Sequence, residues 1–343
     1  MSYDNIVLKA ENINIGYMKG GKVQKLVHEN ISFELNKGEI ISLIGPNGVG
    51  KSTLLRSISG TQNIIKGKIS LNGNDIHKIK HHEISKQISL VLTERGFAES
   101  LKVHEVVALG RYPYTGFFGR LTNIDQEIID KAIIDCGILE IRDSFFSDLS
   151  DGERQKTMIA KALTQEADLI ILDEPTSFLD IISRIEIIEL LRRLAKEHNK
   201  TILLSTHDLE QALTSSDKLM LLSKTEGLKI GIPEDFIFNG ELNKLFSRNN
   251  ISFDAKNGNF TLLLNTENKV YIEGDNSLIR WMTNLMNRLE FIVTDDINKA
   301  EISIYLENHN NISVTFIDYN QTLNLETFND VKDIILKYKK KGI

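Results

Sequence analysis

The sequence of 343 residues contains a single cysteine, Cys136, and only four prolines. One cysteine cannot form an intramolecular disulfide, which fits a reducing compartment. Apolar runs are also short, and none approaches the ~18–20 residues that a membrane-spanning helix needs. The N-terminal segment carries acidic residues and lacks the apolar core of a signal peptide. We therefore expect that the chain itself does not cross a membrane.

The sequence also lacks an excess of basic residues. It has 41 Lys and Arg against 47 Asp and Glu, a net charge of −6, so there is no general attraction to nucleic acid. We expect no nucleic-acid partner. Hydrophobic residues make up 41% of the chain and charged residues 26%, a composition that supports a packed core.

Two regions with different patterns predict two domains. In residues 1–245, short apolar strands alternate with helices, which favours an α/β fold with a mainly parallel sheet and an antiparallel β-subdomain. Apolar residues at helical spacing predict a helical insertion at about 96–165. Residues 246–343 predict a separate α+β domain, to which no role is assigned. Trp281 lies there in an amphipathic stretch, and we expect its ring to be buried.

A glycine-rich stretch after the apolar run Ile40–Ile44 carries the most specific motif. It reads G-x-x-x-x-G-K-S between a predicted strand and a predicted helix, the context of a P-loop. Glycines let backbone N–H groups point at phosphate oxygens, and the helix start adds partial positive charge. Lys51 would contact the β- and γ-phosphates, and the Ser52 hydroxyl would bind Mg²⁺. The predicted nucleotide-binding residues are Gly45, Pro46, Asn47, Gly48, Val49, Gly50, Lys51, Ser52 and Thr53.

Two acidic residues follow a second buried strand. The run Leu169–Leu172 predicts the strand, and Asp173 comes at its carboxyl end, where open α/β sheets bind ligands. Asp173 would hold Mg²⁺, and Glu174 would act as general base on the attacking water. The alternative is an exposed acidic turn before Pro175.

A histidine follows a third strand, Thr201–Ser205. From that edge His207 would reach the γ-phosphate and the water held by Glu174. A lone histidine is more often a structural residue, but its place beside the other two motifs favours a catalytic role. Together the three motifs predict a P-loop NTPase.

The segment Leu149–Gln155, which reads LSDGERQ, resembles the LSGGQ signature of ATP-binding-cassette (ABC) ATPases. The order of the motifs over residues 6 to about 245 is also similar to that family. The resemblance implies ATP and Mg²⁺ as cofactors and a head-to-tail dimer with a second copy of the chain. Ser150 and Gly152 would then face the γ-phosphate of ATP bound to that copy.

The same resemblance implies further nucleotide contacts. Tyr17 stands where the family has an aromatic residue that stacks on adenine, and Asp180 ends the loop after the two acidic residues. Asp151 and Glu153 depart from the usual glycine and glutamine of the signature. Since a carboxylate repels a nucleotide, we expect Asp151 to project outward, toward Lys or Arg.

Glu94 stands at a position where the family usually has glutamine. The resemblance implies a catalytic residue that contacts Mg²⁺ and the water, on a loop that hinges the helical insertion against the core. A carboxylate keeps an oxygen ligand for the metal but loses the amide donor. The alternative is that Glu94 turns to Arg95 or to solvent.

Two further segments, VALGRYPYTG at 106–115 and GIPED at 231–235, resemble the ATPases of importers for iron–siderophore complexes, haem and cobalamin. That branch implies integral-membrane permease subunits as partners and, indirectly, a substrate-binding protein. The chain would be cytoplasmic and peripheral on the inner face of the cell membrane. A set of aromatic residues would line the permease groove or pack internally: Tyr112, Tyr114, Phe117 and Phe118.

A soluble, non-transport ABC ATPase is the alternative function. Repair proteins of this kind carry long coiled-coil heptads between the halves of the cassette, and translation factors usually carry two cassettes. The sequence has neither feature, since only one P-loop occurs. A role in metal-cluster assembly is a third possibility.

Overall fold

The computed structural model of the chain divides into two compact units, Met1–Phe246 with Ala255–Asn259, and Ser247–Asp254 with Phe260–Ile343. Both units combine helices and strands, which confirms the predicted α/β class. Among the described residues, no helix is both long and apolar enough to span a bilayer. The structure describes residues 5–92, 99–116, 119–246, 251–254, 258–308 and 311–341.

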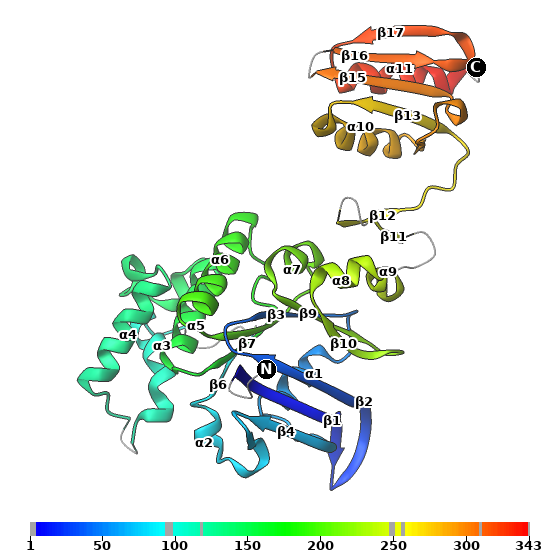
Figure 1. Cartoon of the computed structure of the whole chain (residues 1–343). Coiled ribbons are helices and arrows are strands. Elements are labelled where there is room, and N and C mark those ends of the chain that lie inside the picture. Colours follow the sequence, from blue (N-terminus) through cyan, green and yellow to red (C-terminus); the bar gives the residue numbers. More distant parts are fainter. Residues whose placement is uncertain are drawn as a thin grey trace. The chain divides into compact units, whose positions relative to one another are not determined.

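A six-stranded sheet forms the centre of the first unit (Figure 1). Its neighbouring strands from β9 to β6 are parallel, and β10 pairs antiparallel with β9 at one edge. The carboxyl ends of the parallel strands therefore meet at one edge of the sheet. In spatial order the strands are β10 (Gly227–Gly231), β9 (Lys218–Ser223), β3 (Ile40–Ile44), β8 (Thr201–Ser205), β7 (Leu169–Asp173) and β6 (Ile88–Val91).

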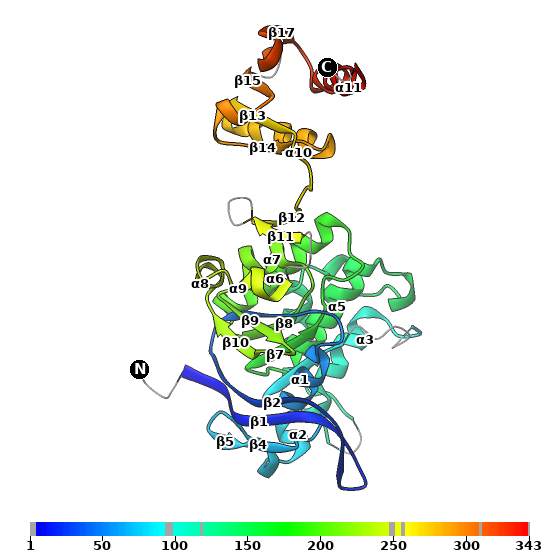
Figure 2. The ribbon, with the colours of Figure 1, turned by 90° about the vertical axis from the view of Figure 1, so that its right-hand side faces the viewer.

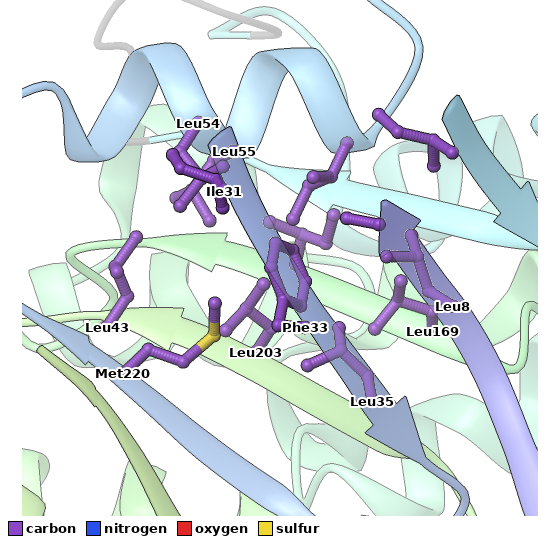
Figure 3. Packing of buried hydrophobic residues seen from close by; sticks show 14 of the residues in the cluster. Leu8, Ile31, Phe33, Leu35, Leu43, Leu54, Leu55, Leu169, Leu203 and Met220 are labelled. Carbon is purple, nitrogen blue, oxygen red and sulfur yellow. The ribbon is translucent and has the colours of Figure 1, made fainter. Parts of the chain in front are cut away.

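A second sheet is antiparallel, as predicted for the β-subdomain. Helix α1 (Lys51–Ile58) lies between the two sheets (Figure 2). Figure 3 shows part of the apolar cluster that joins α1 to both sheets, including Leu54, Leu55, Phe33 and Met220. This cluster fixes the start of α1 against β3. The strands are, in spatial order, β2 (Lys22–Asn36), β1 (Ile6–Lys19), β4 (Lys66–Leu71) and β5 (Asn74–Asp75).

Helices cover the other face of the parallel sheet. Buried residues of β7 and β8 pack there against apolar residues of α5 (Asp151–Thr164) and α6 (Ile181–Glu197). Cys136 belongs to this cluster, and burial raises the pKa of its thiol to about 12. The remaining helices of the first unit are η2 (Ile76–Lys78), α2 (His81–Ile84), α3 (Val103–Ala108), η3 (Leu109–Tyr114), α4 (Asn123–Asp135), η4 (Leu139–Ile141), η5 (Phe146–Asp148), α7 (Leu209–Ser215), α8 (Pro233–Phe238) and α9 (Glu241–Phe246).

A buried arginine joins the elements of the helical insertion. The Nε of Arg111 donates to Asp125 of α4 at 2.8 Å. Its Nη1 donates to the Thr164 carbonyl at 2.9 Å and to Glu166 at 2.6 Å, just beyond α5. Arg111 and Asp125 are only 4% and 6% exposed, so the buried Asp125 carboxylate depends on the guanidinium for neutralisation.

The aromatic residues of this segment differ in how closely they pack against the insertion, and a role in a permease groove stays a prediction. Tyr114 is held against the insertion, because its ring centroid lies 3.9 Å from the Arg111 guanidinium carbon and its hydroxyl donates to the Gln165 carbonyl at 3.0 Å, but 38% of the residue is exposed. Tyr112, in contrast, is 77% exposed. Phe117 and Phe118 lie outside the described residues.

The second unit has its own core, made by a five-stranded sheet and two helices. Leu278, Met282 and Leu285 form the buried face of the first of these helices, whereas Trp281 is 62% exposed. The expectation that Trp281 is buried is therefore wrong, because Met286 also belongs to the buried face, which is turned toward Met282 and Met286 and leaves Trp281 beyond its edge. The elements are β11 (Ile251–Asp254), β12 (Asn259–Leu262), β13 (Lys269–Gly274), α10 (Asn276–Arg288), β14 (Ile292–Val293), η6 (Ile297–Lys299), β15 (Ile302–Asn308), β16 (Asn311–Phe316), η7 (Ile317–Tyr319), β17 (Gln321–Leu325) and α11 (Phe328–Lys341).

The buried ion pair yields a stability prediction. Replacing Arg111 by Met should lower the free energy of unfolding by about 3–5 kcal/mol, because Asp125 would keep a buried charge without its partner. Denaturant unfolding of the full chain measures this change. Arg142→Met is the matched control, since its pair with Asp130 (3.0 Å) is partly exposed and should cost less than about 1 kcal/mol. Equal effects of the two substitutions would contradict the assignment.

Candidate functional site

The glycine-rich loop begins directly after the buried strand β3. Gly45 lies so close to β9 that a Cβ atom there would be 2.4 Å from the Leu222 carbonyl oxygen. Gly50 has a φ of 112°, a conformation that side chains rarely adopt. Close approach at one end and positive φ at the other explain why these two positions of the motif are glycine.

Helix α1 starts at the end of this loop with its first N–H groups uncapped by a side chain. Such groups carry the partial positive charge of the helix start and suit a phosphate. Lys51 adds a full charge, and its Nζ donates to the Gly45 carbonyl at 2.9 Å. Burial lowers the pKa of the Lys51 ammonium, while the charges of Glu174 and Asp173 oppose that shift. The loop and the two carboxylates therefore form one electrostatic site.

A serine at the end of β8 arranges the two carboxylates. Asp173 and Ser205 stand opposite each other in the register of β7 and β8. The Ser205 hydroxyl donates to Asp173 Oδ1 at 2.5 Å and accepts from the Glu174 N–H at 2.9 Å. Sequence reasoning missed Ser205, although its place at the end of the strand before His207 was a signal.

Glu174 and His207 lie together, as the sequence predicts. Glu174 has a φ of 50°, and its Oε2 lies 3.7 Å from His207 Nδ1. The Ser177 hydroxyl also donates to that oxygen at 3.0 Å. A partly exposed carboxylate beside an exposed imidazole is accessible to a water molecule. This arrangement is suited to general-base chemistry.

Tyr17 meets the helix that follows the loop. Its hydroxyl lies 3.1 Å from the Thr53 hydroxyl, and 43% of the residue is exposed. The ring therefore has a free surface next to the loop, as stacking on a base requires. Its role in adenine binding stays a prediction.

The signature segment forms the start of α5. The Ser150 hydroxyl accepts from the Glu153 N–H at 3.3 Å, and the Glu153 carboxylate accepts from the Ser150 N–H at 2.9 Å, which together form a capping box. The Ser150 hydroxyl also donates to that carboxylate at 2.7 Å. The Ser150 hydrogen bonds lower the pKa of Glu153. Asp151 is exposed, with an oxygen 4.0 Å from Arg154 Nη1, so it projects outward onto an arginine as expected.

The signature segment contacts α6 within its own chain. A Cβ on Gly152 would lie 2.8 Å from the Ser183 hydroxyl and 3.1 Å from its Cβ, so a larger residue there would require the Ser183 side chain to move. Asp180 caps α6 by accepting from the Ser183 N–H at 3.0 Å and from the Ser183 hydroxyl at 2.7 Å. Ser183, which sequence reasoning missed, thus links Gly152 to Asp180.

The predicted metal ligands are hard oxygen donors. Ser52 is exposed at the start of α1, and Asp173 ends β7. Among the described residues, no group of three or more His, Cys, Asp and Glu side chains could hold a metal ion. A hydroxyl and one carboxylate fit Mg²⁺, which keeps several waters and also takes phosphate oxygens. Glu94 lies outside the described residues.

Comparison with known proteins identifies the family. The family model described as ABC transporter matches residues 28–177. An uncharacterized ABC transporter ATP-binding protein of Methanocaldococcus jannaschii is 43% identical over 256 residues, 75% of this chain and 87% of that protein. The chain belongs to the ABC transporter ATP-binding proteins. It is therefore an ATPase and binds ATP, as the sequence predicts.

This ABC transporter ATP-binding protein is also similar to the iron(3+)-hydroxamate import ATP-binding protein FhuC of Bacillus subtilis. The two are 39% identical over 65% of this chain and 81% of that protein. A solved nucleotide-free ATP-binding cassette from an ABC transporter has a TM-score of 0.62 at 22% identity and covers 70% of this chain and 97% of that one. This likeness concerns the fold alone, and it confirms the predicted cassette.

The Ser205 bonds yield a kinetic prediction. Ser205→Ala should lower kcat for ATP hydrolysis at least about tenfold, because Asp173 loses a donor and the Glu174 N–H loses its acceptor. ATP affinity should change little, since the glycine-rich loop stays intact. Steady-state hydrolysis and nucleotide titration measure the two effects.

Ser42→Ala is the control for this change. Ser42 is equally buried on the neighbouring strand β3, but its hydroxyl lies 2.6 Å from the Ser216 hydroxyl and not from a carboxylate. A wild-type kcat in Ser205→Ala, or the same loss in both variants, would contradict the role of Ser205.

Proposed function

We propose that the chain is the ATP-hydrolysing subunit of an ABC importer for iron–siderophore complexes. The likeness to a protein named for iron(3+)-hydroxamate import carries this proposal. The segments around Arg111 and Gly231, which resemble importers for siderophores, haem and cobalamin, support it. Haem and cobalamin remain the other candidate cargoes. A non-transport ABC ATPase is not favoured, because the matched relatives are named as transport proteins.

In the proposed reaction, the uncapped start of α1 and Lys51 hold the phosphates. Ser52 and Asp173 would hold Mg²⁺, which would balance phosphate charge. Glu174 takes the proton of the attacking water, and His207 stands beside it toward the γ-phosphate. Support comes from the 3.7 Å separation of these two side chains and from the charge interaction of Lys51 with both carboxylates.

We propose that a second copy completes each site. Ser150 and Gly152 would face ATP held by that copy, head to tail, with the N–H groups at the start of α5 as phosphate donors. In this chain the Ser150 hydroxyl donates to Glu153, so an arriving phosphate must compete with that carboxylate. Glu153 therefore has to turn away when the sandwich forms. Asp180 and Glu94 are proposed to border the same site.

We also propose that the helical insertion binds the integral-membrane permease. Its exposed apolar residues include Tyr112 and Ile124, which are 77% and 67% exposed. The hydrogen bonds of Arg111 connect this segment to α4 and to the end of α5. The chain would then be peripheral on the cytoplasmic face of the membrane and meet a substrate-binding protein only indirectly. Residues 1–245 form the proposed cassette, and 246–343 a separate domain.

The importer proposal predicts a membrane partner. When the tagged full chain is purified from solubilised membranes of its own source, an integral permease should copurify with it. Tyr112→Glu should weaken that association at least about tenfold, because the charge would be desolvated at an apolar contact. The amount of permease per chain, measured by quantitative mass spectrometry, tests both points.

Phe238→Glu is the control, since Phe238 is 88% exposed on α8, outside the insertion. Copurification with soluble partners and no permease would contradict the importer proposal and favour the non-transport alternative.

A further inference from the structure

We propose that His28 is a positioning residue of the nucleotide site: it orients the peptide between Val49 and Gly50 so that the Gly50 N–H is free for a phosphate. The inference rests on the proposed phosphate-binding role of the glycine-rich loop. His28 lies on β2, in the antiparallel sheet, 21 residues before Val49. No motif of the sequence includes it.

The ring makes one defined contact with the loop. Its Nε2 lies 2.7 Å from the Val49 carbonyl oxygen, and His28 is only 5% exposed. A carbonyl oxygen can only accept, so Nε2 carries a hydrogen and the tautomer of the ring is fixed. On the same inward side of β2, Ile31, Phe33 and Leu35 are apolar, so packing alone does not require an imidazole there.

The planar peptide between Val49 and Gly50 means that a bond to the Val49 carbonyl also sets the direction of the Gly50 N–H. The structure has no cis peptide bond in the described residues, so the Val49 carbonyl and the Gly50 N–H point in opposite directions. When His28 holds the carbonyl, the N–H must point away from β2. It joins the uncapped N–H groups at the start of α1, which are the groups proposed to bind phosphate.

The contact also prevents a flip of the Val49–Gly50 peptide, which would otherwise cost little energy. A peptide that ends in glycine flips readily, since glycine has little steric preference for the sign of φ. A flip would turn the carbonyl oxygen toward the phosphate and repel it. A stiffer residue is disfavoured at position 50, because the φ of 112° strains any residue with a side chain and a Cβ there would lie 2.5 Å from Val27 Cγ1. The donor on β2 therefore supplies the constraint that the glycine cannot.

Three substitutions at position 28 separate donation from packing. Gln places an amide N–H close to the position of the imidazole Nε2, Asn is too short to reach, and Leu has no donor. ADP binding to the full chain, measured by calorimetry, should weaken about tenfold in His28→Leu and His28→Asn, the scale of one buried hydrogen bond. His28→Gln should stay within about twofold of wild type.

Two controls keep the outcome unambiguous. In Thr201→Val, a fully buried hydroxyl that donates to the Asn36 carbonyl at 3.0 Å is lost, which should lower Tm without weakening ADP binding. Lys51→Ala should weaken ADP binding whatever His28 does. Wild-type affinity in His28→Asn, or equal losses in the Gln and Asn variants, would overturn the proposal. Wild-type affinity in Lys51→Ala would instead overturn the phosphate site on which it rests.

Discussion

The buried ammonium group of Lys51 is the interaction on which the rest of the site depends. It is 7% exposed, and burial alone lowers its pKa. The charges of Glu174 and Asp173 oppose that shift without cancelling it, and the ammonium donates a hydrogen bond to the Gly45 carbonyl. Gly45 follows β3 and the two carboxylates lie at the end of β7, with β8 between the two strands. The parallel sheet thus brings the Lys51 ammonium and the two carboxylates together at the carboxyl ends of its strands.

Much of this site was predictable from the sequence, because each motif follows its own apolar strand. The residues that join the motifs were not. Ser205 acts through the register of two strands 32 residues apart, and His28 acts across two sheets, so neither contact leaves a local pattern. Trp281 shows the converse: a helical pattern predicts that one face is buried but not which flanking residue stays in water.

The geometry of the signature segment points beyond a single chain. Ser150 contacts Glu153 of α5, and Gly152 lies next to Ser183 of α6. Neither of these contacts involves α1, the helix that follows the glycine-rich loop. Asp180 caps α6 through the same Ser183 hydroxyl, so the signature and this loop should move together. In the proposed dimer, the starts of α1 and α5 would both meet phosphate, and a second copy of the chain would bring the two surfaces together.

Sedimentation of the full-length Glu174→Gln protein with ATP and Mg²⁺ tests this claim most directly, beside the same protein carrying Ser150→Arg. Loss of the proposed general base should trap the state before hydrolysis, and the arginine should block the surface proposed to meet the second nucleotide. We expect a dimer with Glu174→Gln alone and a monomer when Ser150→Arg is added. A dimer that forms equally well with both substitutions would contradict it.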